Sequence, residues 1–175
     1  MVHKKQIFLF DDVVPEELCN KLRSIVRESE GKQEKWEPGQ NVRCKFMLFS
    51  EMKDLDDEVY KIVNNITNSL TDSNPAIKIT SDSGYQLREI YGETRLHSDG
   101  TISNGDENNT RSMSLIIALN DDYEGGELYF PNQEYKVKLK RGQAIAFPPY
   151  WTHPHGANPP LNGTFRYTIN TWLLE

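Results

Sequence analysis

The stretch that decides the fold is the last strand-like run of the chain, residues 165–173, which reads Phe-Arg-Tyr-Thr-Ile-Asn-Thr-Trp-Leu. Because successive side chains of a β-strand point to opposite faces, this run divides into an apolar and a mostly polar set. The polar set comprises Arg166, Thr168, Asn170 and Trp172. In a small β-sandwich this set would point into the interior, where an unpaired guanidinium is costly. The sequence therefore predicts an anion beside Arg166, supplied either by the protein or by a ligand carboxylate.

Outside this strand, the two halves of the chain differ in their pattern of apolar residues. The first half contains two amphipathic patterns of helical period, at about 15–29 and 56–70. The second half consists of short β-rich runs separated by glycine, proline and asparagine. Helices followed by many short strands are typical of an α+β, mainly β fold. The expected strands are 6–10, 44–49, 85–91, 113–119, 128–130, 135–139, 144–147 and 165–173.

We expect these elements to form a two-sheet β-sandwich or a jelly roll (double-stranded β-helix), with N-terminal supporting helices. At 175 residues the chain is long enough for one domain with a real core. The prediction is a single domain over 1–175, with helical support over about 1–75 and the jelly-roll core over about 76–175. No internal repeat and no second domain is indicated.

Composition excludes several classes of function. The chain has no run of about 18 apolar residues, so we expect no membrane span, and its first residues do not resemble a signal peptide. Two cysteines, Cys19 and Cys44, do not make a disulfide framework. A net charge of −6 argues against nucleic-acid partners. We expect a cytoplasmic protein, whose oligomeric state the sequence does not indicate.

Three of the four histidines gather in two short motifs, His97-Ser98-Asp99 and His153-Pro154-His155. On a strand, His97 and Asp99 would share one face. Two imidazoles and one carboxylate form the facial triad of non-haem iron(II) oxygenases, which leaves three metal positions open. A lone H-x-D triplet is a weak signal, so the interpretation depends on the sequence around it.

An ordered series of short motifs surrounds the triplet. The motifs are Tyr91-Gly92, His97-Ser98-Asp99, Arg111 with Ser114, Leu115–Asn120, Gly125-Gly126-Glu127, Phe130-Pro131, Val137–Phe147, and His155 with Pro159, Gly163, Arg166 and Trp172. From about Tyr85 to Leu173 this series resembles the Fe(II)- and 2-oxoglutarate-dependent dioxygenases, in their prolyl 4-hydroxylase-like branch. The cationic residue is Arg166, where animal collagen prolyl hydroxylases use lysine. His155 fits the family's spacing to the following proline and glycine, and His153 does not.

The resemblance implies a set of cofactors and roles. Fe(II), 2-oxoglutarate and dioxygen are implied, and ascorbate is a candidate accessory. Fe(II) would be held by His97, Asp99 and His155. The distal carboxylate of 2-oxoglutarate would pair with Arg166. Further residues expected at the cosubstrate are Tyr91, Ser114, Thr168 and Trp172.

The implied activity is hydroxylation of a side chain, with a peptidyl proline as the favoured target and a peptide or protein as the favoured partner. Alternatives are a hydroxylase of a free amino acid or other small molecule, and a non-catalytic cupin-like metal-binding protein. Residues 31–41 and 100–110 are expected to be loops that bear on substrate choice. The second could be a lid that orders over the substrate or an idle loop. Trp36, in the first loop, is either a substrate contact or a residue that packs the loop onto the core.

Overall fold

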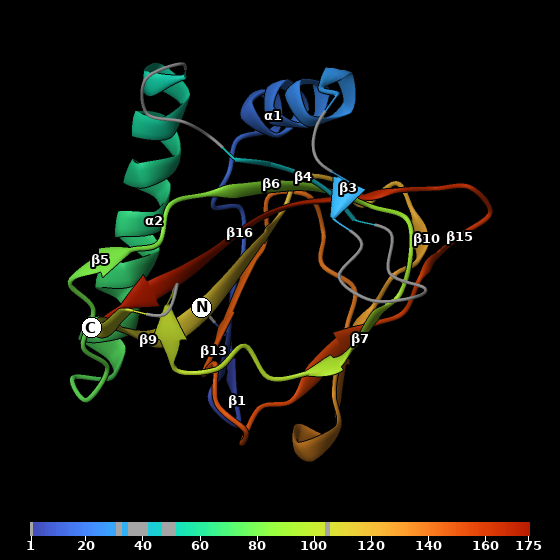
Figure 1. The fold of residues 1–175 in the computed structure, drawn as a ribbon. Helices are drawn as coiled ribbons and strands as arrows, with labels where there is room; N and C mark the ends of the chain where they lie inside the picture. The colour runs from blue at the N-terminus through green and yellow to red at the C-terminus, as the bar shows by residue number, and fades with distance from the viewer. Residues whose placement is uncertain (1, 31–32, 35–41, 47–51, 104–105) are drawn as a thin grey trace.

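Short antiparallel strands make up most of the protein, and two α-helices lie beside them in the computed structural model (Figure 1). The α+β, mainly β prediction is therefore confirmed. Trp36 and most of the expected loop at 31–41 fall outside the residues that the structure describes. The described residues are 2–30, 33–34, 42–46, 52–103 and 106–175.

Both expected helices are present, at α1 (Glu16–Glu28) and α2 (Lys53–Ser73), and α2 is longer than its apolar pattern at both ends. A short 3₁₀ turn, η1, spans Pro131–Gln133. The strands over the described ranges are β1 (Val2–Lys4), β2 (Ile7–Phe10), β3 (Gln33–Glu34), β4 (Val42–Phe46), β5 (Ser81–Asp82), β6 (Gln86–Ile90), β7 (Thr94–His97), β8 (Ile102–Ser103), β9 (Asp106–Ala118), β10 (Glu124–Gly125), β11 (Leu128–Phe130), β12 (Tyr135–Val137), β13 (Ala144–Phe147), β14 (His155–Ala157), β15 (Pro160–Leu161) and β16 (Arg166–Leu174).

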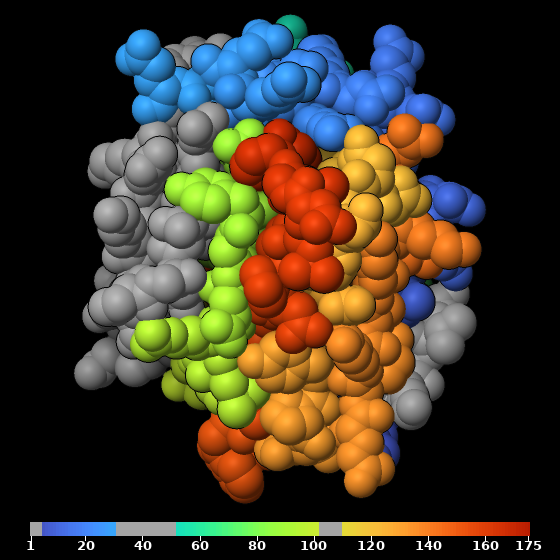
Figure 2. Space-filling model, turned by 90° about the vertical axis from the view of Figure 1, so that its right-hand side faces the viewer, coloured from blue at the N-terminus to red at the C-terminus, as the bar shows by residue number. Residues whose placement is uncertain are grey.

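The strands of the described residues form a ten-stranded main sheet, a four-stranded small sheet and a separate two-stranded pair of β10 and β15. The main sheet has the order β1-β2-β13-β9-β16-β6-β4-β3, with β5 beside β16 and β8 beside β9. The small sheet has the order β12-β11-β14-β7. In it, β14 pairs with β11 on one side and with β7 on the other. On the face shown in Figure 2, green, red and orange segments lie side by side below α1. Segments far apart in the sequence thus meet in the small sheet, while β16 lies in the middle of the main sheet.

The helices cover one face of the main sheet. In α1, Glu16 and Glu17 occupy the first turn, where the positive end of the helix dipole stabilises them. Leu18, Leu22 and Val26 form its buried stripe. They pack with residues of α2 and of the main sheet in the larger apolar core. Figure 1 shows both helices on one side of the main sheet and β7 on the other.

The alternation predicted for the last strand is present in β16. Tyr167, Ile169 and Leu173 are buried in the core beneath the helices. The polar set, which includes Arg166 and Thr168, lines a pocket on the opposite face. A second, smaller apolar core lies on this side and includes residues of β11, β13 and β14. The position of the helices therefore leaves the polar face of β16 for the site.

The prediction of an irregular loop at 100–110 is wrong for most of that range. Over the described residues, β8 pairs with β9, which begins at Asp106, and Ile102 lies opposite Thr110. Backbone N–H and C=O groups pair in such a ladder whatever the side chains are. The polar composition of the segment therefore conceals a strand pairing that does not depend on apolar periodicity.

Candidate metal centre and pocket

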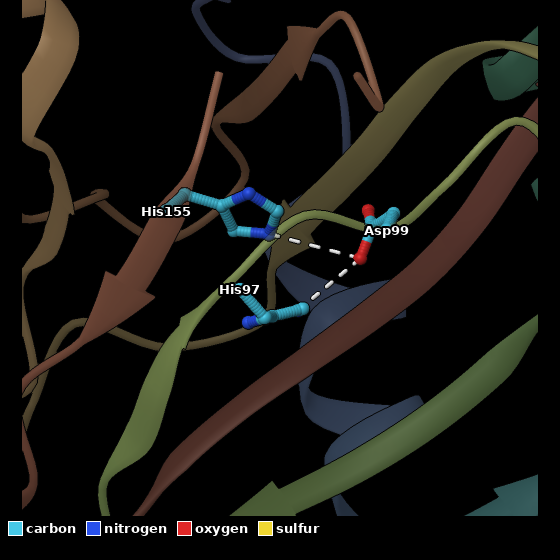
Figure 3. A group of neighbouring side chains, drawn as sticks. All are labelled: His97, Asp99 and His155. Carbon is cyan, nitrogen blue, oxygen red and sulfur yellow. Dashed lines mark ion pairs between the residues drawn. The ribbon is translucent and has the colours of Figure 1, made fainter. Parts of the chain in front are cut away.

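Two paired strands bring the candidate metal ligands together. His97 ends β7, His155 begins β14, and the two residues are direct partners in the small sheet. Asp99 follows β7, and its Oδ1 lies 3.2 Å from Nε2 of His97 and 3.8 Å from Nε2 of His155. One donor atom from each residue can be chosen so that all three lie within 4.8 Å of one another. Figure 3 shows the carboxylate of Asp99 turned toward both imidazoles.

The hydrogen bonds of the two imidazoles suit a metal. Nδ1 of His97 lies 2.8 Å from the carbonyl of Arg95, and Nδ1 of His155 lies 3.2 Å from the carbonyl of His153. A carbonyl accepts only, so each Nδ1 carries the proton and donates. Each Nε2 then keeps a free lone pair directed at the cluster, as in metal-ligating histidines. Two neutral imidazoles and one carboxylate fit a divalent iron ion.

Charge and burial keep Asp99 ionised and His155 neutral, while the contact with Asp99 raises the pKa of His97. Burial alone would raise the pKa of Asp99, but the adjoining imidazole of His97 and hydrogen bonds from Ser114 and Trp172 hold it well below its ordinary value. Burial lowers the pKa of His155 to about 4. The ring of Phe147 causes part of this burial, with its centroid 4.5 Å from that of His155. His155 is therefore neutral at physiological pH.

The second oxygen of Asp99 is held by the main sheet. Ser114 Oγ and Trp172 Nε1 both donate to Oδ2, the latter over 3.0 Å. Arg111 donates from Nη1 to the backbone carbonyl of Asp99, and its guanidinium lies 3.9 Å from the centroid of the Trp172 ring. With Oδ2 occupied in this way, Oδ1 is the oxygen that Asp99 presents to the histidines.

The hydrogen bonds of His153 account for both of its ring nitrogens without a metal. It is buried, its Nδ1 lies 2.9 Å from Thr152 Oγ1, and its Nε2 lies 3.0 Å from the carbonyl of Lys5. It joins the segment before β14 to the turn between β1 and β2. Of the two histidines in the motif, only His155 is in the cluster.

Arg166 is buried on the pocket side of β16. Its Nη1 donates to the carbonyl of Gly126 over 3.0 Å, and its Nε has no partner among the described residues. Burial lowers its pKa to about 10, which leaves it charged at pH 7. No carboxylate of the described chain pairs with it. The anion predicted from the sequence is therefore left to a ligand.

A cavity of about 320 Å³ joins the cluster to Arg166, lined by residues of both sheets. Seven of the eight candidate residues line this cavity, and Tyr91 does not. Tyr91 instead packs edge-on against Phe165, with ring centroids 6.1 Å apart. The residues brought together are His97, Asp99, Ser114, His155, Arg166, Thr168 and Trp172.

Further polar residues line the cavity without a role assigned from sequence, among them Arg88, Arg111 and Asn170. Asn170 accepts a hydrogen bond from Thr168 over 2.7 Å. It belongs to the polar face that alternation along the last strand predicted to point inward. Arg88 lies opposite Thr168 in the register of β6 and β16, which the sequence pattern does not give.

The model of the 2OG-Fe(II) oxygenase superfamily matches residues 85–174, slightly more than half of the chain, and the chain belongs to this family. A relative is the putative prolyl 4-hydroxylase of Acanthamoeba polyphaga mimivirus, 32% identical over 72 residues. That alignment covers 37% of this chain and only 30% of the relative.

Solved prolyl hydroxylases share the fold. The viral collagen prolyl hydroxylase of Paramecium Bursaria Chlorella virus-1, in its 2OG complex, has a TM-score of 0.75 at 19% identity, covering 97% of this chain and 96% of the other. A Pseudomonas putida prolyl-4-hydroxylase has a TM-score of 0.73 at 16% identity, covering 97% and 92%. A Trichoplax adhaerens prolyl hydroxylase, solved with a hypoxia inducible factor peptide, has a TM-score of 0.74 at 14% identity, covering 97% and 83%.

Neither helix of the described chain combines the length and apolar character that crossing a membrane requires.

Proposed function

We propose that this member of the superfamily hydroxylates a peptidyl proline, with Fe(II) and 2-oxoglutarate as cofactors. The observation that carries the proposal is one cavity that contains both a cluster of His97, Asp99 and His155 and a buried Arg166 that no carboxylate of the described chain neutralises. A passive metal binder would have no use for such a cation. A dicarboxylate cosubstrate supplies its counter-ion.

His97, Asp99 and His155 would hold Fe(II) on one face and leave the rest of the coordination sphere to cosubstrate and dioxygen. When bound, iron, 2-oxoglutarate and dioxygen supply oxidative decarboxylation to succinate and carbon dioxide, with one oxygen atom passing to the substrate C–H bond. Ser114 and Trp172 keep Asp99 Oδ2 occupied, so that Oδ1 faces the metal. The protein thereby fixes the ligand geometry before the metal binds.

Arg166 orients the cosubstrate. A guanidinium can offer two parallel hydrogen bonds to a carboxylate. Its burial excludes competing water, so the pair would be stronger than one at the surface. Thr168 lines the same cavity, but its hydroxyl already donates to Asn170 Oδ1. Ser114 and Trp172 are engaged with Asp99, and Tyr91 lies off the cavity, so we assign the distal carboxylate of the cosubstrate chiefly to Arg166, with Thr168 assisting only if its hydroxyl turns away from Asn170.

A peptidyl substrate is supported by the relatives and by access to the centre. The relatives named above are prolyl hydroxylases, and the Trichoplax adhaerens protein was solved with a peptide. The side chain of His97 is 42% exposed, so a bulky substrate can approach the cluster from solvent. A free amino acid or another small molecule is the alternative substrate.

The proposal includes finer points that follow from the resemblance. We place the double-stranded β-helix over about 76–175, helical support over about 1–75, and one domain over 1–175. Dioxygen is the oxidant, ascorbate a candidate accessory reductant, and the cytoplasm the proposed location.

The test is an aerobic reaction of the purified protein with Fe(II), 2-oxoglutarate and a library of proline-containing peptides. Succinate and a mass gain of one oxygen atom on a peptide proline are the expected products, and Asp99→Ala is the inactive control. Oxygen added only to free amino acids would favour the alternative substrate. If the protein binds the metal but forms no succinate with either peptides or free amino acids, the proposed oxygenase activity is excluded.

A further inference from the structure

The cavity is cationic although the chain that builds it is acidic. The chain has a net charge of −6, yet Arg111 and Arg166 line the cavity and Asp99 is the one acidic residue among its described lining residues. Arg88 and Arg95 also line the cavity, but each interacts with other groups of the chain. Fe(II) and 2-oxoglutarate carry opposite double charges, so binding the pair leaves the balance of Arg111, Arg166 and Asp99 unchanged. A substrate that brings negative charge would be favoured there.

Arg166 and Arg111 lie at opposite ends of the cavity. Trp172, on which the Arg111 guanidinium stacks, follows Arg166 by six positions on β16, which corresponds to about 20 Å along a strand. Asp99 lies at the Trp172 end, since both Trp172 and Arg111 donate to it. A 2-oxoglutarate that extends from the metal toward Arg166 therefore points away from Arg111.

Arg111 has hydrogen-bonding capacity left over. Its guanidinium donates to the carbonyl of Asp99 and stacks on the ring of Trp172. The Asp99 carboxylate attracts it electrostatically, but the side-chain oxygens of Asp99 are engaged by other groups and do not hydrogen-bond to it. Its Nε is buried without a partner in the described part of the chain. A guanidinium has five N–H donors in a planar fork that matches a carboxylate.

We propose that Arg111 binds a carboxylate of the substrate, and that the enzyme prefers a peptide with an acidic residue beside the target proline. This inference rests on the proposed function and adds the chemical class of its substrate. The free α-carboxylate of an amino acid offers Arg111 the same chemistry as an acidic side chain. The experiment therefore distinguishes the two sources.

The probes are three peptides with blocked ends and one central proline, identical except for Glu, Gln or Lys at the neighbouring position. Free L-proline is the fourth. Binding is measured by calorimetry under anaerobic conditions with Mn(II) and 2-oxoglutarate, so that no turnover is needed. The proteins are wild type, Arg111→Gln and the matched control Arg27→Gln, whose arginine is exposed on α1 and away from the cavity.

Wild type and Arg27→Gln should bind the Glu peptide at least about tenfold more tightly than the Gln peptide, and the Lys peptide most weakly. Arg111→Gln should bind the Glu and Gln peptides almost equally. This ratio is informative because a general weakening of the site would lower both affinities together. Arg111-dependent binding of free proline with no binding of any peptide would assign the carboxylate to a free amino acid.

Equal affinity of wild type for the Glu and Gln peptides would overturn the inference, as would binding of none of the four probes. A preference for the Glu peptide that persists in Arg111→Gln would assign it to another residue. Transfer of oxygen is measured separately on the same peptides with Fe(II). Hydroxylation without any charge preference leaves the proposed function intact and refutes only the role of Arg111.

Discussion

Trp172 donates its indole N–H to Oδ2 of Asp99 over 3.0 Å, and this bond decides which oxygen of the carboxylate faces the histidines. Ser114 donates to the same oxygen. Oδ1 is left 3.2 Å from His97 Nε2 and 3.8 Å from His155 Nε2. Trp172 thus holds Asp99 and also lines the cavity, and its expected place at the cosubstrate stays a prediction.

Replacing Trp172 by Phe should weaken Fe(II) binding while preserving the ring beneath Arg111. Residues that hydrogen-bond to a metal ligand typically contribute a factor of about 10 to 100 in metal affinity or activity. We therefore expect the dissociation constant of Fe(II) to rise about tenfold. The measurement is anaerobic Fe(II) titration. Trp151→Phe is the matched control, because Trp151 is 81% exposed and does not line the cavity. Equal Fe(II) affinity in Trp172→Phe and wild type would show that the hydrogen bond does not support the metal.

Arg166→Ala should raise the dissociation constant of 2-oxoglutarate steeply and leave Fe(II) binding nearly intact. Loss of one member of a buried charged pair costs on the order of 2–5 kcal/mol of binding. This corresponds to roughly 30- to 5,000-fold in affinity. Arg166→Lys should restore part of the loss, because lysine keeps the charge but not the planar fork. The readouts are 2-oxoglutarate affinity and succinate production.

An unchanged 2-oxoglutarate affinity in Arg166→Ala would remove this residue from the cosubstrate site. The control is Arg27→Ala, whose arginine is exposed on α1. Circular dichroism of each variant checks that removal of a buried cation has not unfolded the protein.

Asp56→Asn should stabilise the fold at pH 7. Asp56 is buried on α2, its Oδ1 has no partner in the described chain, and burial together with the charges of Asp82 and Asp57 raises its pKa. Ionised Asp56 therefore opposes folding. Its neutral replacement should add about 1 kcal/mol to the free energy of unfolding. In a chain of this size that raises Tm by roughly 3 °C.

The pH dependence gives Asp56→Asn a second test. A raised pKa in the folded state means that folding favours the protonated carboxyl, so its ionisation removes stability as the pH rises. At low pH the wild-type carboxyl is already neutral, and the gain of the variant should disappear. Asp57→Asn is the control, because Asp57 is exposed and pairs with Lys53. A lower Tm for Asp56→Asn than for wild type at pH 7 would refute the argument.

Alternation along the last strand was sufficient to predict which residues face the site. Arg166, Thr168, Asn170 and Trp172 were grouped by period alone, and all four line the cavity. Such a prediction succeeds because the side-chain period of a strand is fixed by backbone geometry. The two helices were predicted for a similar reason, since an apolar stripe of helical period has to be buried.

The pattern along one strand does not say which residue of another strand lies opposite. Ser114 reaches Asp99 because Ser114 and Trp172 are direct partners between β9 and β16. That register depends on the whole sheet and could not be obtained from the sequence. Tyr91 shows the same limit, because it follows the end of β6 and lies against Phe165, off the cavity.

The prediction of an irregular loop after Asp99 was wrong for a different reason. The pairing of β8 with β9 satisfies backbone groups, which are the same for every residue except proline. Composition therefore does not reveal it. The lining of the cavity outside the last strand is also hard to predict, because Arg88 and Arg111 contribute from strands whose neighbours the sequence does not identify.

The most direct test of the metal centre is an anaerobic Fe(II) titration of wild type, His155→Ala and His153→Ala. Wild type should bind one Fe(II) per chain. His153→Ala should retain the metal and lose some stability, since His153 is bonded to the carbonyl of Lys5. His155→Ala should lose tight Fe(II) binding while remaining folded. Tight Fe(II) binding by His155→Ala together with its loss in His153→Ala would contradict the proposed set of His97, Asp99 and His155.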